Sequence, residues 1–203
     1  MADVDTGAVI EIAGIGDVEV LLSEERIRQR VTEIGAEISR AYAGEDLLLI
    51  SILKGGIVFL SDLMRAISIP HEIDFLSVSS YGDGTRSSGR VRLLHDLSRE
   101  ITGRHVLLVE DIIDTGRTLA YLLEYLQLRQ PASLRVCALI HKDIAEPREV
   151  AADFTGFQIP DRFVIGYGMD LAERYRNLPF VGAIPEALVE AVASHHQQTT
   201  ENA

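Results

Sequence analysis

The sequence predicts an α/β fold in which helices flank a mainly parallel, twisted β-sheet. Three short runs, at residues 47–53, 106–109 and 134–140, are apolar almost throughout. A strand buried on both faces has this composition, whereas a half-exposed strand alternates apolar with polar residues. Helical patterns lie between these runs. Strands that alternate with helices are typical of parallel sheets, which bind ligands at the carboxyl ends of their strands.

Composition and charge limit the class of protein and its partners. The 203 residues are 47% hydrophobic, enough for one domain with a substantial core. A formal net charge of −12 argues against an extended nucleic-acid surface. No apolar stretch has membrane length and the acidic first residues do not resemble a signal peptide, so we expect a cytoplasmic protein without a membrane partner. The single cysteine, Cys137, lies in an apolar run and should be a buried thiol.

The first part of the sequence predicts a short β region followed by a long helix. Apolar residues alternate with acids near the end of residues 1–22, which suggests one or two strands. Ser23 fits the N-cap of a helix with acids in its first turn, and apolar spacings of three and four continue to about residue 42. Gly44 is expected to end this helix.

A glycine-rich turn follows the strand predicted at residues 47–53. Lys54, Gly55 and Gly56 stand immediately before a helix expected to run to about residue 67. Free backbone N–H groups at a helix start, together with a lysine, favour an anion. A plain turn can have the same composition, so this motif becomes informative only beside a second anion site.

Residues 71–79 are expected to form a strand that leads into a loop. The loop, residues 80–89, contains three glycines and four serine or threonine residues, a composition that predicts mobility. The chain should then return as a strand at 90–94 and continue through a linker at 96–103.

The central motif begins where the strand predicted at residues 106–109 ends in two acids, Glu110 and Asp111. A turn of hydroxyl side chains and glycine follows, and residues 118–130 predict a helix with one apolar face. A strand, a turn and a helix N-terminus in this order favour the binding of a phosphate. The motif differs from a Walker A loop, which has lysine where this sequence has Arg117. Two acids would repel a bare phosphate. The ligand should therefore carry hydroxyls or a metal beside its phosphate, as a sugar phosphate does.

Beyond this motif, the strand at 134–140 is followed by Lys142, which by itself would be a solvated residue. The remaining predicted elements are an irregular stretch at 143–152, short strands at 154–157 and 163–170, a short helix at 185–193 and a polar tail at 194–203.

Residues 110–116, Glu-Asp-Ile-Ile-Asp-Thr-Gly, resemble the PRPP-binding motif of the type I phosphoribosyltransferases, in their hypoxanthine-guanine branch. The Lys-Gly-Gly turn, Lys142 and the Arg-Tyr-Arg-Asn-Leu-Pro run at 174–179 occur in the order found in that family, so the resemblance covers about residues 10–185. The family fold it implies is a single domain of residues 1–203, with a core at about 24–150, a small hood formed by about 8–23 and 151–190, and the tail.

The resemblance implies a glycosyltransferase of purine salvage. Such an enzyme transfers the 5-phosphoribosyl group from PRPP to N9 of a 6-oxopurine, hypoxanthine or guanine, and releases pyrophosphate with Mg²⁺ as cofactor. PRPP is then expected to contact Lys54, Gly55, Ser80, Tyr81, Glu110, Asp111, Thr115, Gly116, Arg117, Thr118 and Arg176. The purine is expected to contact Ile113, Lys142, Phe163, Val164 and Asp170. The magnesium ligands are expected to be Glu110, Asp111 and Asp170.

The resemblance also assigns roles within this set. Asp114 is the candidate general base for the N7 proton, and Lys142 would donate to the purine O6 atom. Phe163, which without the resemblance would be a core residue, would stack on the purine. Ser80 and Tyr81 would close over pyrophosphate, and the peptide bond before Lys54 can be cis.

Two other functions stay open at this point. One is a phosphoribosyltransferase for adenine, xanthine or orotate, although a lysine donor such as Lys142 suits a 6-oxo group and disfavours a 6-amino group. The other is a non-enzymatic relative that keeps the PRPP site and binds RNA. Binding RNA would require a basic face on the protein. Self-association is expected by family analogy, as a homodimer or a homotetramer.

Overall fold

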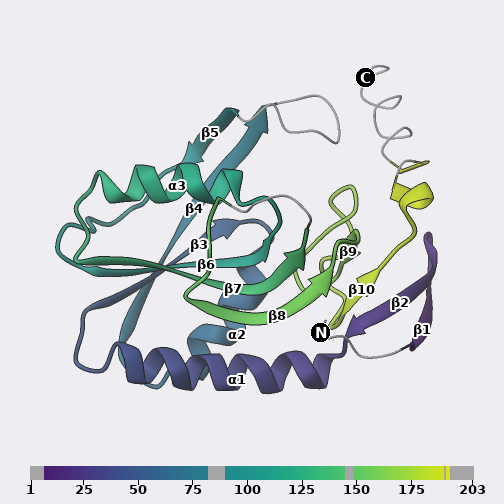
Figure 1. The fold of residues 1–203 in the computed structure, drawn as a ribbon, viewed down its shortest axis with the longest axis horizontal. Coiled ribbons are helices and arrows are strands. Elements are labelled where there is room, and N and C mark those ends of the chain that lie inside the picture. The colour runs from purple at the N-terminus through teal and green to yellow at the C-terminus, as the bar shows by residue number, and fades with distance from the viewer. Residues whose placement is uncertain (1–6, 82–89, 145–148, 190, 193–203) are drawn as a thin grey trace.

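Two β-sheets organise the part of the chain that the computed structural model describes, residues 7–81, 90–144, 149–189 and 191–192 (Figure 1). The larger sheet has six strands in the order β5-β4-β3-β6-β7-β8, and the smaller has four in the order β1-β2-β10-β9. In chain order, the elements are β1 Val9–Ile12, β2 Gly16–Leu22, α1 Glu24–Ala41, β3 Leu47–Leu53, α2 Ile57–Ala66, β4 His71–Tyr81, β5 Arg90–His95, β6 His105–Ile113, α3 Arg117–Gln127, β7 Ser133–Asp143, β8 Phe154–Pro160, β9 Val164–Ile165 and β10 Val181–Ala183.

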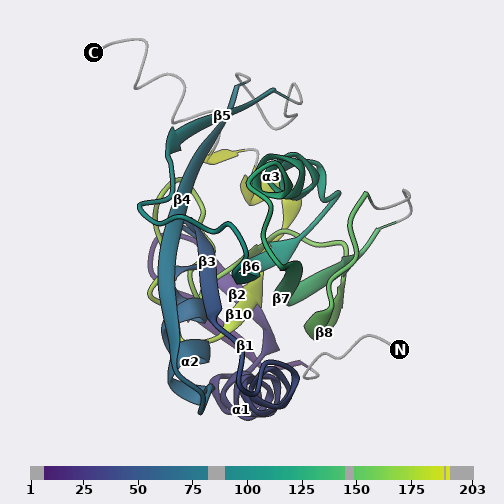
Figure 2. The same ribbon diagram turned by 90° about the vertical axis from the view of Figure 1, so that its left-hand side faces the viewer.

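The larger sheet is mainly parallel, as predicted. Strands β4, β3, β6, β7 and β8 run parallel to their neighbours, and only the edge strand β5 is antiparallel, to β4. One face packs against α1 and α2 and the other against α3, an arrangement visible in Figures 1 and 2. In Figure 2, β4 and β5 extend at the top beyond the other strands.

Strand β6 lies in the middle of this sheet, and its apolar run is fully buried. Leu107 and Val109 pack in the core with α1 and α2, while Val106 and Leu108 pack in the core with α3. Successive residues of a strand point to opposite faces, so a strand covered on both sides has no polar face. This explains why the run does not alternate in the sequence.

The predicted helices are present with small shifts at their ends. Helix α1 begins after Ser23, whose carbonyl accepts the Ile27 N–H, and ends before Gly44, where φ is +86°. Helix α3 ends at Gln127, three residues earlier than expected, and buries the apolar face that the sequence indicated.

Cys137 is buried, and burial raises the pKa of its thiol. In the described part of the chain, no helix has the length and hydropathy needed to cross a membrane.

Most strands of the larger sheet are longer than predicted, and β6 and β7 show why. Strand β6 continues to Ile113 and β7 to Asp143, because the pairing of these two strands extends through Ile112 and His141. The acids at 110–111 therefore lie inside a strand, and Lys142 lies within β7 rather than beyond it. Neighbouring strands, and not the apolar run itself, determine where these strands end.

The smaller sheet joins strands from the N-terminal part of the chain with strands from its C-terminal part. Strand β10, which the sequence did not predict, pairs with β2 on one side and β9 on the other. Strand β8 lies in the larger sheet, paired with β7, although the sequence analysis assigned its residues to the hood. Residues 186–189 and 191–192 are helical, consistent with the predicted last helix. Residues 82–89 of the predicted loop and the polar tail lie outside the described residues.

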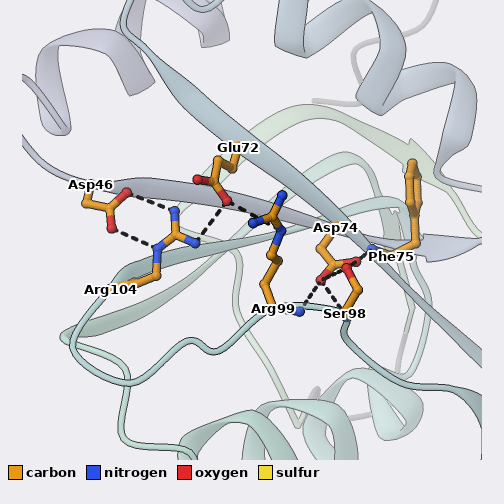
Figure 3. Close-up of polar contacts among 7 residues, drawn as sticks. All are labelled: Asp46, Glu72, Asp74, Phe75, Ser98, Arg99 and Arg104. Carbon is orange, nitrogen blue, oxygen red and sulfur yellow. Dashed lines mark hydrogen bonds and ion pairs between the residues drawn. The ribbon is translucent and has the colours of Figure 1, made fainter.

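Polar contacts hold the larger sheet together at the end away from the carboxyl termini of its strands (Figure 3). Arg104, just before β6, makes two contacts of 2.8 Å with the carboxylate of Asp46, just before β3, and one of 3.1 Å with Glu72 in β4. Asp74, also in β4, is buried and accepts the backbone N–H groups of Ser98 and Arg99 at 2.8 and 3.1 Å. These contacts align three parallel strands and the linker that enters β6.

We expect Asp74→Ala to lower the free energy of unfolding by about 1–3 kcal/mol, because it removes the buried carboxylate that accepts hydrogen bonds from the N–H groups of Ser98 and Arg99. Urea unfolding measures this loss. Asp74→Asn should recover part of it, since one carbonyl oxygen remains. Asp17→Ala, at an exposed position of β2, is the control and should change stability by about 0.5 kcal/mol or less. Equal losses in Asp74→Ala and Asp17→Ala would contradict the anchoring role.

Candidate active site

A cavity of about 470 Å³ opens at the carboxyl ends of the parallel strands, where the sequence placed the ligand. All the predicted site residues line it except Ser80 and Tyr81, whose side chains lie outside the described part of the structure. The predicted residues in its wall are Lys54, Gly55, Glu110, Asp111, Ile113, Asp114, Thr115, Gly116, Arg117, Thr118, Lys142, Phe163, Val164, Asp170 and Arg176. Met169, which the sequence places next to Asp170, also lines the cavity, as does Val78, to which the sequence assigned no role.

The first anion site is the turn between β6 and α3. Gly116 occupies the N-cap of α3 with φ of +79°, a left-handed conformation that suits glycine. The helix then begins at Arg117, so the N–H groups of its first turn have no partner within the helix and face the cavity end of the sheet. The helix dipole adds a partial positive charge. This turn is suited to a phosphate group.

The second anion site follows β3, on the neighbouring strand. The peptide bond between Leu53 and Lys54 is cis, as the resemblance allowed. Gly55 packs so closely that a Cβ atom there would lie 2.1 Å from Asp111 Oδ2, and a Cβ on Gly168 would lie 2.2 Å from the Gly55 carbonyl oxygen. Only glycine fits these two contacts. The backbone of Gly55 therefore packs between the Asp111 side chain and the backbone of Gly168.

Of the two acids near the end of β6, Asp111 is buried and Glu110 is half-buried. Glu110 Oε2 is buried without a hydrogen-bond partner among the described residues. Burial, together with the neighbouring charge of Asp111, raises the pKa of Glu110 well above its usual value. Burial also raises the pKa of Asp111 to about 6, although the Ile112 N–H donates to Asp111 Oδ1 at 3.0 Å. Buried carboxylates of this kind are stabilised by hydroxyl donors or by a cation.

Acids accompany the basic residues of the cavity. Lys142 Nζ lies 3.4 Å from Asp114 Oδ2 and 3.5 Å from Asp161 Oδ1. Arg176 Nη2 lies 2.8 Å from Asp170 Oδ1, and its Nη1 donates to the Gly168 carbonyl at 2.7 Å.

Arg117 and Lys54 complete the basic set. Arg117 Nε lies 3.8 Å from Glu149 Oε1, and Lys54 Nζ lies 2.9 Å from Glu173 Oε2. The sequence reasoning did not assign Asp161, Glu149 or Glu173. Their positions outside the recognised motifs gave no signal, apart from the three-residue spacing of Glu173 from both Asp170 and Arg176.

Another part of the cavity wall can hold a flat ring. Phe163 is 37% exposed at the cavity, while Val164 is buried in β9. Lys142 and Asp114 line the same cavity, at the ends of β7 and β6. An ammonium donor and a carboxylate acceptor within one hydrogen-bond length of each other can read two neighbouring polar atoms on the edge of a heterocycle.

The predicted magnesium ligands do not form a ready-made cage. Within the described chain, no three acidic, histidine or cysteine side chains converge as a metal site. Asp170 lies near enough to Asp111 that its charge raises the pKa of Asp111. Mg²⁺ commonly binds through one or two carboxylates together with phosphate oxygens and water. These acids therefore fit a magnesium ion that the substrate brings with it, and the ligand set stays a prediction.

We expect Asp111→Asn to stabilise the free protein above pH 6, in EDTA. The raised pKa means that the folded state binds the Asp111 proton more tightly than the unfolded chain does, so stability present near pH 4 is lost as the pH rises through about 6. At neutral pH the free energy of unfolding of the variant should exceed that of the wild type by roughly 2–3 kcal/mol. This difference should disappear near pH 4. Urea unfolding across this pH range measures it.

Asp46→Asn is the matched control, because its hydrogen bond with Arg104 lowers the pKa of Asp46. Its pH dependence should have the opposite sign, with a small loss of stability at neutral pH that vanishes in acid. A constant effect of Asp111→Asn at every pH would contradict the role of burial.

The comparisons with known proteins agree with this geometry. Residues 17–172 match the phosphoribosyl transferase domain family. Over 176 residues the sequence is 49% identical to a hypoxanthine-guanine phosphoribosyltransferase from Mycobacterium avium, covering 83% of this chain and 87% of that protein. It is 46% identical to a hypoxanthine-guanine phosphoribosyltransferase from Bacillus subtilis, covering 86% of this chain and 98% of the relative.

Solved structures show the same fold. A hypoxanthine phosphoribosyltransferase from Staphylococcus aureus superimposes with a TM-score of 0.80 at 42% identity, covering 84% of this chain and 92% of the other. A hypoxanthine phosphoribosyl transferase from Trypanosoma cruzi also superimposes with a TM-score of 0.80, at 39% identity, covering 87% and 95% of the two chains. The chain therefore belongs to the phosphoribosyl transferase domain family.

Proposed function

We propose that this protein is a purine-salvage enzyme that transfers the 5-phosphoribosyl group of PRPP to N9 of hypoxanthine, guanine or both, giving IMP or GMP and pyrophosphate. The observation that carries the proposal is the single cavity that combines two anion sites, two dehydrated acids and a lysine–aspartate pair. PRPP offers two phosphate-bearing ends with ribose hydroxyls between them. The names of the similar proteins support the same reaction.

The ribose 5-phosphate end of PRPP fits the turn before α3. Its phosphate would accept hydrogen bonds from the N–H groups of the first helical turn and from the hydroxyls of Thr115 and Thr118. The 2′- and 3′-hydroxyls would donate to Glu110 and Asp111. Donors at this place would supply the missing partner of Glu110 Oε2. The acids that would repel a bare phosphate thus suit a sugar phosphate.

The pyrophosphate end fits the second anion site. Lys54 and Arg176 would neutralise its charge as the bond to C1 breaks. Mg²⁺, when bound, supplies further positive charge to the phosphate oxygens, with Asp111, Glu110 and Asp170 as the candidate protein ligands. Breaking this bond leaves positive charge on the ribose ring, and the carboxylates at the end of β6 favour that charge electrostatically.

The purine would lie between Phe163 and the ends of β6 and β7. Lys142 would donate to O6, and Asp114 would accept the N7 proton as N9 attacks C1. Lysine has donors only, so it favours a 6-oxo group over the 6-amino group of adenine. The Lys142–Asp114 pair is already within hydrogen-bond reach, so one edge of the base would meet a donor and an acceptor that are held side by side.

The first test is nucleotide formation from PRPP and Mg²⁺ with hypoxanthine, guanine, xanthine and adenine supplied in parallel. We expect product from the 6-oxopurines hypoxanthine, guanine or both, and none from adenine. Separation of the nucleotides by chromatography measures each product. Absence of product from every base, with PRPP still bound, would contradict the enzyme and favour a non-enzymatic PRPP-binding protein.

A second test concerns the general base. Asp114→Asn should lower kcat by about 10²–10⁴-fold, since it removes the proton acceptor, and should change PRPP affinity far less. Steady-state kinetics and PRPP titration separate the two effects. Asp161→Asn is the matched control, because Asp161 also contacts Lys142 but does not line the cavity. Its kcat should stay closer to that of the wild type. Similar small changes in kcat and PRPP affinity for Asp114→Asn would contradict the role.

Two further expectations belong to this proposal. Self-association as a homodimer or homotetramer is expected by family analogy, and the solved Trypanosoma cruzi structure was described in a study of the oligomeric state and enzymatic activity of that protein. The cytoplasm is the expected compartment, because the proposed substrates are soluble metabolites of nucleotide salvage. Sedimentation measurements and cell fractionation test these expectations directly.

A further inference from the structure

Glu173 contacts both basic side chains that the proposed function assigns to pyrophosphate. Its Oε2 atom lies 2.9 Å from Lys54 Nζ and 3.3 Å from Arg176 Nη2. Lys54 follows β3, whereas Arg176 lies in the chain between β9 and β10, so one carboxylate joins two separate parts of the cavity wall. Hydrogen bonds from Lys54 and Arg176 lower the pKa of Glu173, which keeps its carboxylate ionised at neutral pH.

The backbone around Glu173 is tightly specified. Its φ is +65° and that of Ala172 is +50°, a left-handed conformation that non-glycine residues seldom adopt. The Glu173 N–H donates to Asp170 Oδ2 at 2.8 Å, and Leu171 and Arg174 exchange two backbone hydrogen bonds of 3.1 Å. Unusual backbone conformations of this kind cluster at ligand sites. The turn holds the carboxylate beside the two cations.

The other acid–base pairs of the cavity are different. Asp114 contacts Lys142, and Glu149 contacts Arg117, each reaching one basic residue of the wall. Within the described residues, Glu173 is the one carboxylate that pairs with two basic residues of the cavity. The Lys54 and Glu173 side chains are 67% and 61% exposed, so their contact can be exchanged for a ligand at small cost.

We propose that Glu173 is an internal anion that competes with pyrophosphate for Lys54 and Arg176. In the free protein its carboxylate occupies the two cations, and a bound pyrophosphate takes both of them from it. When pyrophosphate leaves, Glu173 pairs with the same cations again. The residue thus weakens the hold of the site on the leaving group and favours its release. This inference rests on the proposed function and adds to it a residue that limits product affinity.

Titration calorimetry with inorganic pyrophosphate in EDTA tests the proposal on the full-length protein. Glu173→Gln keeps the size of the side chain and removes its charge, so pyrophosphate should bind about three- to tenfold more tightly, the size expected for two partly exposed ion pairs. The gain should shrink as salt is added. In the nucleotide-formation assay, the inhibition constant for pyrophosphate should fall by a similar factor. A purely structural role would weaken binding or leave it unchanged.

Two variants complete the experiment. Glu173→Asp keeps the charge with a shorter reach and should give an affinity between those of the wild type and Glu173→Gln. Glu100→Gln removes the same charge at an exposed position outside the cavity and should leave pyrophosphate affinity close to that of the wild type.

Three results would overturn the proposal: unchanged or weaker binding in Glu173→Gln, an equal gain in Glu100→Gln, or no pyrophosphate binding by the wild type and Glu173→Gln alike. Nucleotide formation by the wild type decides the proposed function separately. The failure of the Glu173 proposal can therefore be distinguished from the failure of the proposed function.

Discussion

The burial of β6 on both faces is the constraint on which the candidate site depends. Its apolar run lies between two hydrophobic cores, so the residues that follow on the same strand enter the cavity without the hydration of a surface loop. Glu110 and Asp111 are held there with raised pKa values. A dehydrated carboxylate is unfavourable until a donor or a cation reaches it. The free protein therefore carries a local destabilisation that a polyhydroxy, phosphate-bearing ligand relieves.

The charges of the cavity show how an acidic protein can bind an anion. The chain has a net charge of −12, and an acid pairs with each of Lys54, Arg117, Lys142 and Arg176. Binding of a phosphate is then an exchange of one anion for another, not the neutralisation of a bare positive site. Such an exchange limits affinity while it keeps the cations correctly placed. An enzyme that must release a highly charged product benefits from this limit.

The sequence predicted the large sheet and most of the site because those features depend on local patterns. Strand β3 has the predicted bounds, since an apolar run there is closed by a glycine-rich turn. Strands β6 and β7 extend further because they pair with each other, which no single run reveals. Strand β10 is three residues long and forms only beside β2 and β9. The contact between Lys54 and Glu173 joins residues 119 positions apart, beyond the reach of spacing arguments.

The placement of the purine side follows from the way the two sheets meet. The anion sites stand on the larger sheet, whereas Val164 belongs to β9 of the smaller one. Strand β9 is held by β10, β10 by β2, and the Phe163 carbonyl accepts the Ile184 N–H at 3.2 Å. The N-terminal strands, which touch no predicted ligand, therefore help to position Phe163, the candidate stacking residue, in the cavity that Lys142 also lines. Under the proposed function, base selection would depend on sheet packing as well as on the residues that contact the base.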